Sequence, residues 1–343
     1  MIWKNIEIFN IAELIELPDG AVTWRRVPEE AEQTLERGDQ SLRYSRGFTG
    51  VELRFVLKGE KAVIRMAKAQ DDGVDNSFQV FRGGFQGPYG DYALHKVINT
   101  MEPVDVEITP VALPDRLALM AEKSDLGWDT NVIRIRFDRG QYKLLDVIGD
   151  VEPPKPEQCP EKTLLVYGSS ISVGMDSQTV TTAWASQVAF HLKTDLRNMS
   201  FAGSCLLEPK VCDYLADLGT QGKWDMAILE LGINALSFEP EKVESRCRYI
   251  LQQVAGRNPQ KPVFVVSPFH SPGDLTGLGK APFWRQTLSR IIAEGQYPNV
   301  RYIDGMEVLG DISWFTADGL HPSAYGHVKI AEGILAHIRN AGF

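Results

Sequence analysis

Thr163-Leu-Leu-Val-Tyr-Gly-Ser-Ser-Ile171 joins a short apolar run to a turn that carries two serines. The apolar run predicts a buried strand, and Ser170 follows at the junction between strand and turn. Further apolar runs occupy residues 195–200, 226–231, 262–267 and 300–303. Amphipathic stretches typical of helices occupy residues 182–192, 240–256, 281–294 and 323–340. Short buried strands interleaved with helices predict an α/β fold, with a parallel sheet covered by helices on both faces.

The first half of the chain has a different pattern, in which apolar and polar residues alternate. This period of two is typical of half-buried strands, and it recurs at residues 51–57, 62–66, 104–108, 131–137 and 142–148. Turn-forming stretches separate the strands, for example Lys58-Gly-Glu60, and only residues 28–36 show a weak helical pattern. Several short strands with such turns predict an all-β sandwich similar to a jelly roll.

A proline-rich stretch, Asp150-Val-Glu-Pro-Pro-Lys-Pro-Glu-Gln-Cys-Pro160, separates the two patterns. Its composition is typical of an extended, semi-rigid linker. The length of 343 residues also favours two domains. We therefore predict a β-sandwich domain at residues 1–152, a linker at 153–160 and an α/β domain at 161–343.

Composition excludes several classes of partner. The net charge is −9 and no cluster of lysine and arginine is present, so we expect no nucleic-acid partner. No apolar run approaches the roughly 18 residues of a membrane span, so we expect no membrane partner. The four cysteines fit neither a metal-binding spacing nor a disulfide framework, and we expect no metal and no cofactor. The first residues lack the pattern of a secretory signal, which predicts a cytoplasmic protein, although a longer secreted precursor could yield the same chain. The oligomeric state is left open.

Asp318-Gly-Leu-His321 places a carboxylate three residues before an imidazole. A serine becomes a good nucleophile when a base takes its proton and a third group orients that base. Ser170, His321 and Asp318 supply these three parts. Ligands of parallel α/β sheets bind at the carboxyl ends of the strands, which is where these segments are expected to lie. Each motif alone also fits an ordinary turn or helix start, but their combination predicts an acyl-transfer hydrolase.

Four blocks of the second half resemble the SGNH/GDSL hydrolase family, whose members are serine esterases on a flavodoxin-like three-layer α/β/α fold. The blocks are Gly168-Ser-Ser-Ile171, Asn198-Met-Ser-Phe-Ala-Gly203, Gly232-Ile-Asn234 and Asp318-Gly-Leu-His-Pro322. The resemblance implies that Ser170 is the nucleophile and that Asp318 and His321 complete the triad. It also implies an oxyanion hole built from the Ser170 and Gly203 backbone N–H groups and the Asn234 side chain.

Two positions depart from the family pattern. Ser169 stands where many relatives have aspartate, and Ala235 replaces an acid that often follows the asparagine. Together with the β-rich first half, Gly-Ser-Ser-Ile resembles the branch of carbohydrate esterases that remove acetyl groups from sugars. The expected substrate is therefore a small-molecule or oligosaccharide ester. A lipase or thioesterase of the same family is one alternative, and a carbohydrate-binding protein with an inactive hydrolase scaffold is another.

Aromatic and imidazole side chains near the four blocks could contact a sugar. His270, Trp314 and Phe238 are the predicted substrate-binding residues, although packing would explain each of them as well. A second aromatic group surrounds Gly83-Gly84 in the first half and is expected to face the catalytic domain. Its members are Phe78, Phe81, Phe85, Tyr89 and Tyr92.

Overall fold

The computed structural model describes residues 1–70, 77–87, 96–97 and 101–343. The chain forms two compact units. Unit 1 contains residues 1–28, 43–161 and 193–195, and unit 2 contains residues 29–42, 162–192 and 196–343. Residues 29–42 thus belong to unit 2, although they lie within the stretch 1–152 that the sequence predicts as one domain.

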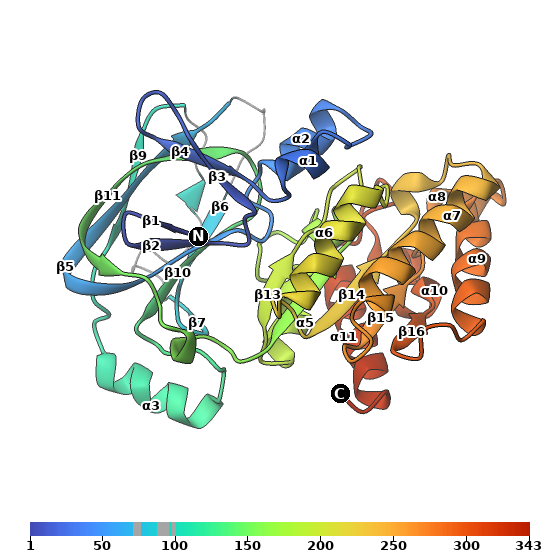
Figure 1. Cartoon of the computed structure of the whole chain (residues 1–343). Coiled ribbons are helices and arrows are strands. Elements are labelled where there is room, and N and C mark those ends of the chain that lie inside the picture. Colours follow the sequence, from blue (N-terminus) through green and yellow to red (C-terminus); the bar gives the residue numbers. More distant parts are fainter. Residues whose placement is uncertain (71–76, 88–95, 98–100) are drawn as a thin grey trace. The chain divides into compact units, whose positions relative to one another are not determined.

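Unit 1 is built around an antiparallel sheet (Figure 1). Its strands are β1 (Ile2–Trp3), β2 (Ile6–Phe9), β3 (Glu13–Glu16), β4 (Val22–Arg25), β5 (Glu52–Lys68), β6 (Ser77–Arg82), β7 (Phe85–Gln86), β8 (Lys96–Val97), β9 (Val104–Ile108), β10 (Val132–Phe137) and β11 (Tyr142–Glu152). The main path runs β3-β4-β11-β5-β10-β6-β7. Phe48 lies at the centre of the aromatic core, with ring centroids 4.4 Å from Trp24 and 3.8 Å from Phe137. The β-rich character is confirmed, and the jelly-roll arrangement stays a prediction.

Strand β5 corrects one expectation for unit 1. The sequence predicts a turn at Lys58-Gly-Glu60, whereas β5 continues through it beside β11 (Figure 1). The pairing shifts register there, since Leu57 pairs with Val151 and Ala62 pairs with Gly149. Such a bulge takes up extra residues without ending the strand, and glycine often marks it.

Helices in the first half were largely missed by the sequence pattern. Residues 29–45 carry α1 (Glu29–Glu32) and α2 (Asp39–Ser45), which only partly match the helix expected at 28–36. Helix α3 (Pro114–Ser124) was not expected; it has proline in its first turn and buries none of its residues. Phe78 and Phe81 are buried in unit 1, whereas Tyr89 and Tyr92 lie outside the described residues. The expectation that this aromatic group faces the catalytic domain stays a prediction.

Unit 2 is a three-layer α/β/α structure, as predicted. Its strands are β12 (Thr163–Tyr167), β13 (Asp195–Asn198), β14 (Met226–Glu230), β15 (Val263–Val266) and β16 (Val300–Ile303). They lie in the order β13-β12-β14-β15-β16, and the neighbours from β12 to β16 pair in parallel. This is the flavodoxin-like order. All five strands occupy the expected stretches.

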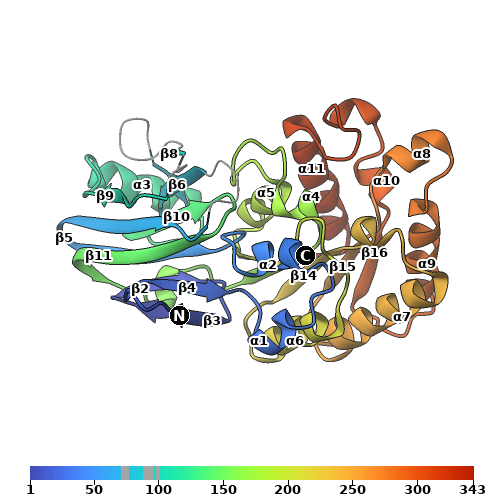
Figure 2. The same cartoon turned by 90° about the horizontal axis from the view of Figure 1, so that it is seen from above.

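Helices cover both faces of the unit 2 sheet (Figure 2). The longer ones are α5 (Trp184–His191), α6 (Pro209–Thr220), α7 (Pro240–Ile250), α9 (Ala281–Ala293) and α11 (Ala324–Asn340). Figure 2 shows α5 and α11 on one side of β14 and β15, and α6, α7 and α9 on the other. Helix α6 was not expected, whereas the other four follow the sequence prediction. Among the described helices, none combines the length and apolar character that crossing a bilayer requires.

Candidate active site

Ser170 lies at the first position of the short helix α4 (Ser170–Val173), directly after strand β12 and the turn Gly168-Ser169. Ser169 caps this helix, because its Oγ accepts a hydrogen bond from the Ile171 N–H at 3.2 Å. Ser170 therefore lies at the carboxyl end of a central strand, on a turn that the Ser169 cap stabilises. Ser170 is only 8% exposed.

The structure brings Ser170, His321 and Asp318 together. Ser170 Oγ lies 2.8 Å from His321 Nε2, and His321 Nδ1 lies 2.6 Å from Asp318 Oδ2. A carboxylate on Nδ1 keeps the proton on that nitrogen, which leaves Nε2 free to accept the serine proton. The three side chains have the connectivity of a nucleophile, a general base and an orienting acid.

Asp318 is held in place by its own loop. Its Oδ1 accepts hydrogen bonds from the backbone N–H groups of Leu320 and His321 and from the Thr316 hydroxyl, at 2.8, 2.9 and 2.7 Å. Partial burial alone would raise the pKa of Asp318, but these hydrogen bonds and the His321 ring hold it well below its usual value. Asp318 is therefore a carboxylate at every pH at which the imidazole works as a base.

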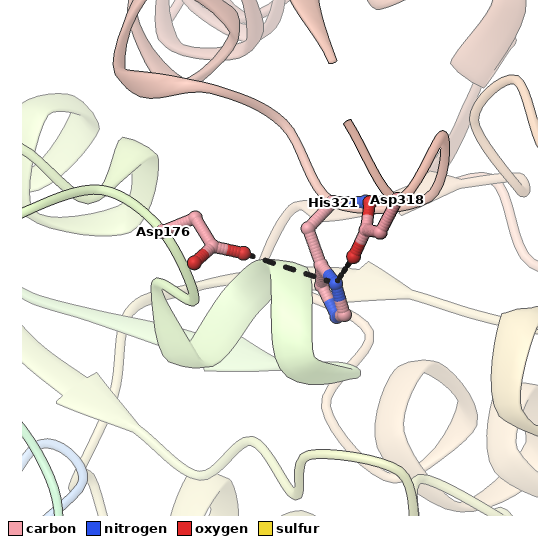
Figure 3. Close-up of side chains that lie close together, drawn as sticks. All are labelled: Asp176, Asp318 and His321. Carbon is pink, nitrogen blue, oxygen red and sulfur yellow. Dashed lines mark hydrogen bonds and ion pairs between the residues drawn. The ribbon is translucent and has the colours of Figure 1, made fainter. Parts of the chain in front are cut away.

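Asp176 is a second carboxylate near the imidazole, and no sequence signal pointed to it. Figure 3 shows Asp176 and Asp318 approaching His321 from different segments. Asp176 Oδ2 lies 3.9 Å from His321 Nδ1, too far for a hydrogen bond. These three side chains could offer metal ligands that lie within 4.8 Å of one another. His321 Nδ1 already lies 2.6 Å from Asp318. We therefore interpret Asp318 and His321 as a hydrogen-bonded pair, and Asp176 as a nearby negative charge.

His327 fixes the loop that carries Asp176. Its Nδ1 accepts the Trp184 backbone N–H at 3.3 Å, so Nε2 carries the proton and donates to the Met175 carbonyl at 2.8 Å. Burial lowers the pKa of His327 to about 4. This histidine is therefore neutral and structural at neutral pH.

Gly203 and Asn234 are, with Ser170, the residues expected to form an oxyanion hole, and this role stays a prediction. Asn234 Oδ1 accepts the Cys205 backbone N–H at 3.1 Å, which leaves its Nδ2 group available. Within the described residues, neither this Nδ2 nor the backbone N–H groups of Ser170 and Gly203 donate to a protein acceptor. Gly203 has φ +67°, a conformation that favours glycine. These groups are free to bind a negatively charged oxygen.

Glu230, the last residue of β14, lies beneath the nucleophile turn. Its Oε2 accepts hydrogen bonds from the Ser169 N–H at 2.7 Å, the Ser169 hydroxyl at 2.6 Å and the Ser172 hydroxyl at 3.0 Å. Its Oε1 is buried and has no partner among the described residues. Burial raises the pKa of Glu230 to about 7, against the opposing effect of these hydrogen bonds. The unusual Ser169 is thus matched by a carboxyl group from the neighbouring strand.

The predicted substrate-binding residues have packing partners. Trp314 packs against the core of unit 2, and its carbonyl accepts the Ser323 N–H at 2.8 Å. His270 is buried, with its ring centroid 5.8 Å from that of Phe315. Phe238 lies under the Lys242 ammonium group, 3.9 Å from its ring centroid. None of these contacts tests substrate binding, and the three assignments stay predictions.

Comparison with known proteins agrees with the predicted family. Residues 166–329 match the GDSL-like lipase/acylhydrolase family. No match was found among curated proteins. A salicylyl-acyltransferase from a tetracycline biosynthetic pathway has a similar structure, with a TM-score of 0.75 and 17% identity over 99% of this chain and 95% of that one.

Two carbohydrate-active enzymes have the same fold over both units. A family two carbohydrate esterase from Cellvibrio japonicus has a TM-score of 0.63 and 13% identity, over 98% of this chain and 95% of that one. An acetyl xylan esterase from the rumen bacterium Butyrivibrio proteoclasticus has a TM-score of 0.56 and 11% identity, over 99% and 97%. At these identities the likeness shows the fold alone. All four sequence blocks lie within residues 166–329, the part of the chain that matches the GDSL-like lipase/acylhydrolase family.

Proposed function

We propose that the protein is a serine esterase that hydrolyses short-chain esters, with acetyl as the acyl group and a carbohydrate as the alcohol. The observation that carries the proposal is the hydrogen-bonded path from Ser170 Oγ through His321 to Asp318, with distances of 2.8 and 2.6 Å. The fold shared with a family two carbohydrate esterase and an acetyl xylan esterase supports the choice of alcohol.

The reaction proceeds in two halves. Ser170 Oγ attacks the ester carbonyl carbon while His321 Nε2 takes its proton, and the carbonyl oxygen becomes negative. The Ser170 and Gly203 N–H groups and Asn234 Nδ2 bind that oxygen. His321 then gives the proton to the leaving alcohol, and acyl-Ser170 remains. Water, deprotonated by His321, attacks the acyl-enzyme and releases the acid and Ser170.

Transfer of the acyl group to an alcohol instead of water is the second candidate. The salicylyl-acyltransferase has the highest TM-score of the three structures described above, and both reactions use the same acyl-enzyme. The two differ only in which nucleophile reaches acyl-Ser170. The product ratio of acid to new ester, measured at rising concentrations of an acceptor sugar, separates them.

The test compares wild type with Ser170→Ala on 4-nitrophenyl acetate and acetylated sugars. We expect the substitution to lower kcat/KM by about 1,000-fold or more. Equal rates would overturn the mechanism. A series of longer acyl chains separates an acetyl esterase from a lipase or thioesterase. Sugar binding without labelling of wild type by a fluorophosphonate would instead favour an inactive scaffold that binds carbohydrate.

A further inference from the structure

Residues 36–40, which lie between β4 and β5 in the chain, are fixed to unit 2 by charged contacts. The Glu36 carboxylate contacts Lys242 Nζ at 2.7 Å and the Arg246 guanidinium of the same helix, α7. The Glu36 backbone N–H donates to Glu208 Oε1 at 3.3 Å. This short segment is therefore held against α7 and the loop before α6, within the unit that carries the candidate active site.

Gln40 contacts the peptide unit that joins Ala202 to Gly203. Its Nε2 donates to the Ala202 carbonyl at 3.4 Å, and the Ser204 hydroxyl donates to the same oxygen at 3.3 Å. A Cβ added to Gly203 would collide with the Gln40 amide nitrogen, so that side chain packs directly over the glycine. The Ala202 carbonyl and the Gly203 N–H belong to one planar group and cannot turn independently.

Arg37 contacts the backbone of Asn234, a second candidate oxyanion-hole residue. Its guanidinium donates to the Asn234 backbone carbonyl at 2.9 Å. The Asn234 side chain is fixed separately, through Cys205. Arg37 and Gln40 thus contact the backbone at two of the three candidate oxyanion-hole residues, Asn234 and Gly203.

We infer that Gln40 and Arg37 are positioning residues of the oxyanion hole. Gln40 orients the Gly203 N–H through the carbonyl of the same peptide, and Arg37 holds the Asn234 backbone while adding positive charge nearby. The inference rests on the proposed acyl-transfer function. Hydrogen bonds polarise one another along a chain, so a donor on the Ala202 carbonyl makes the Gly203 N–H a stronger donor. Neither residue touches substrate in this account.

Kinetics of Gln40 variants test the inference. We expect Gln40→Ala to lower kcat by about 10-fold, less than the 10²–10³ typical of a direct donor, with KM changed less than about 2-fold. Gln40→Glu keeps the size of the side chain but places a carboxylate, which cannot donate, beside the developing negative charge. It should therefore lose at least as much activity as the alanine variant. The matched control is Gln33→Ala, which changes an exposed glutamine outside residues 36–40 but within residues 29–42, and it should keep wild-type rates.

A boronic acid inhibitor, which mimics the tetrahedral intermediate, supplies the second readout. Its affinity for the Gln40 variants should fall in proportion to kcat/KM, whereas affinity for the product alcohol should not change. Full activity in Gln40→Glu with a loss only in Gln40→Ala would reduce the role to packing and overturn the inference. Activity equal to that of Gln33→Ala would overturn it too. Failure of the proposed function looks different, because wild type itself would then not hydrolyse esters.

Arg37 is tested in the same assay. Arg37→Ala should lower kcat by about 5-fold, and Arg37→Lys should recover part of that loss, because lysine keeps the charge and a donor. Wild-type kcat in Arg37→Ala would remove Arg37 from the inference.

Discussion

Asp318 and Asp176 are equally exposed, and both face His321 Nδ1, yet only Asp318 lies within hydrogen-bond distance. The carboxylate that orients a catalytic imidazole must fix its tautomer, which requires a short contact. At 3.9 Å, Asp176 can only stabilise the imidazolium through space, and solvent screens that effect at an exposed site.

We therefore expect Asp318→Asn to lower kcat by about 10⁴-fold, because asparagine can donate to Nδ1 and so favours the wrong tautomer. Asp176→Asn, the matched control, should lower kcat by less than about 5-fold. Steady-state rates of the two variants on one acetyl ester check this. A similar loss in both would mean that the carboxylates share the role.

Glu230 shows how a pair of neighbouring strands shapes the nucleophile turn. Glu230 is the last residue of β14, and its carboxyl group accepts hydrogen bonds from Ser169 and Ser172. These two serines follow β12, the strand that pairs with β14. The pKa of Glu230 is raised from 4.5 to about 7 in the folded protein. The folded state therefore holds a proton that the unfolded chain loses. Stability from this group is present below pH 4.5 and is lost as the pH rises through 7.

We expect Glu230→Gln to remove this pH dependence while keeping the acceptor oxygen. The free energy of unfolding of the variant minus that of wild type should rise between pH 4.5 and 8 by on the order of 3 kcal/mol. His327, whose lowered pKa costs stability as the pH falls from 6.5 towards 4, is present in both proteins, so its effect cancels. Urea unfolding at several pH values measures the difference, and Glu241→Gln, an exposed acid on α7, is the control. A difference that does not change with pH would contradict the account.

The strands and long helices of unit 2 were largely predictable because their period and boundaries are local. Strand β5 was not, since the pairing with β11 determines whether Lys58-Gly-Glu60 forms a turn or a bulge. Ser170, Asp318 and His321 could be found from residue type and order. Glu230 could not, because an acid at the end of an apolar run carries no local sign of the serines above it.

For the chain as a whole, the domain bounds predicted from the sequence misplace two segments, residues 29–42 and residues 193–195. Residues 29–42 belong to unit 2, although the strands before and after them, β4 and β5, belong to unit 1. The contacts that hold the segment join Glu36 to Lys242 and Arg246, some 200 positions later in the chain. No local pattern reports a contact of this kind, so the sequence could not assign the segment to the second unit.

Glu36→Gln should separate activity from stability. An ion pair at the surface contributes about 0–1 kcal/mol, and the Glu36 pairs are partly exposed, so the free energy of unfolding should change by less than about 1 kcal/mol. The segment should nevertheless be less firmly held, which we expect to speed amide hydrogen exchange in residues 29–42 and to lower kcat by about 3-fold. Exchange mass spectrometry and steady-state kinetics measure both. Unchanged exchange together with unchanged kcat would show that these ion pairs do not hold the segment.

Ester hydrolysis by this mechanism passes through a covalent acyl-Ser170 intermediate. Rapid acid quenching during turnover of an acetyl ester, followed by peptide mass spectrometry, tests it directly. We expect wild type to carry one acetyl group on the peptide that contains Ser170, and Ser170→Ala to carry none. Turnover by wild type with no acetylated Ser170, or with the acetyl group on another residue, would contradict the account.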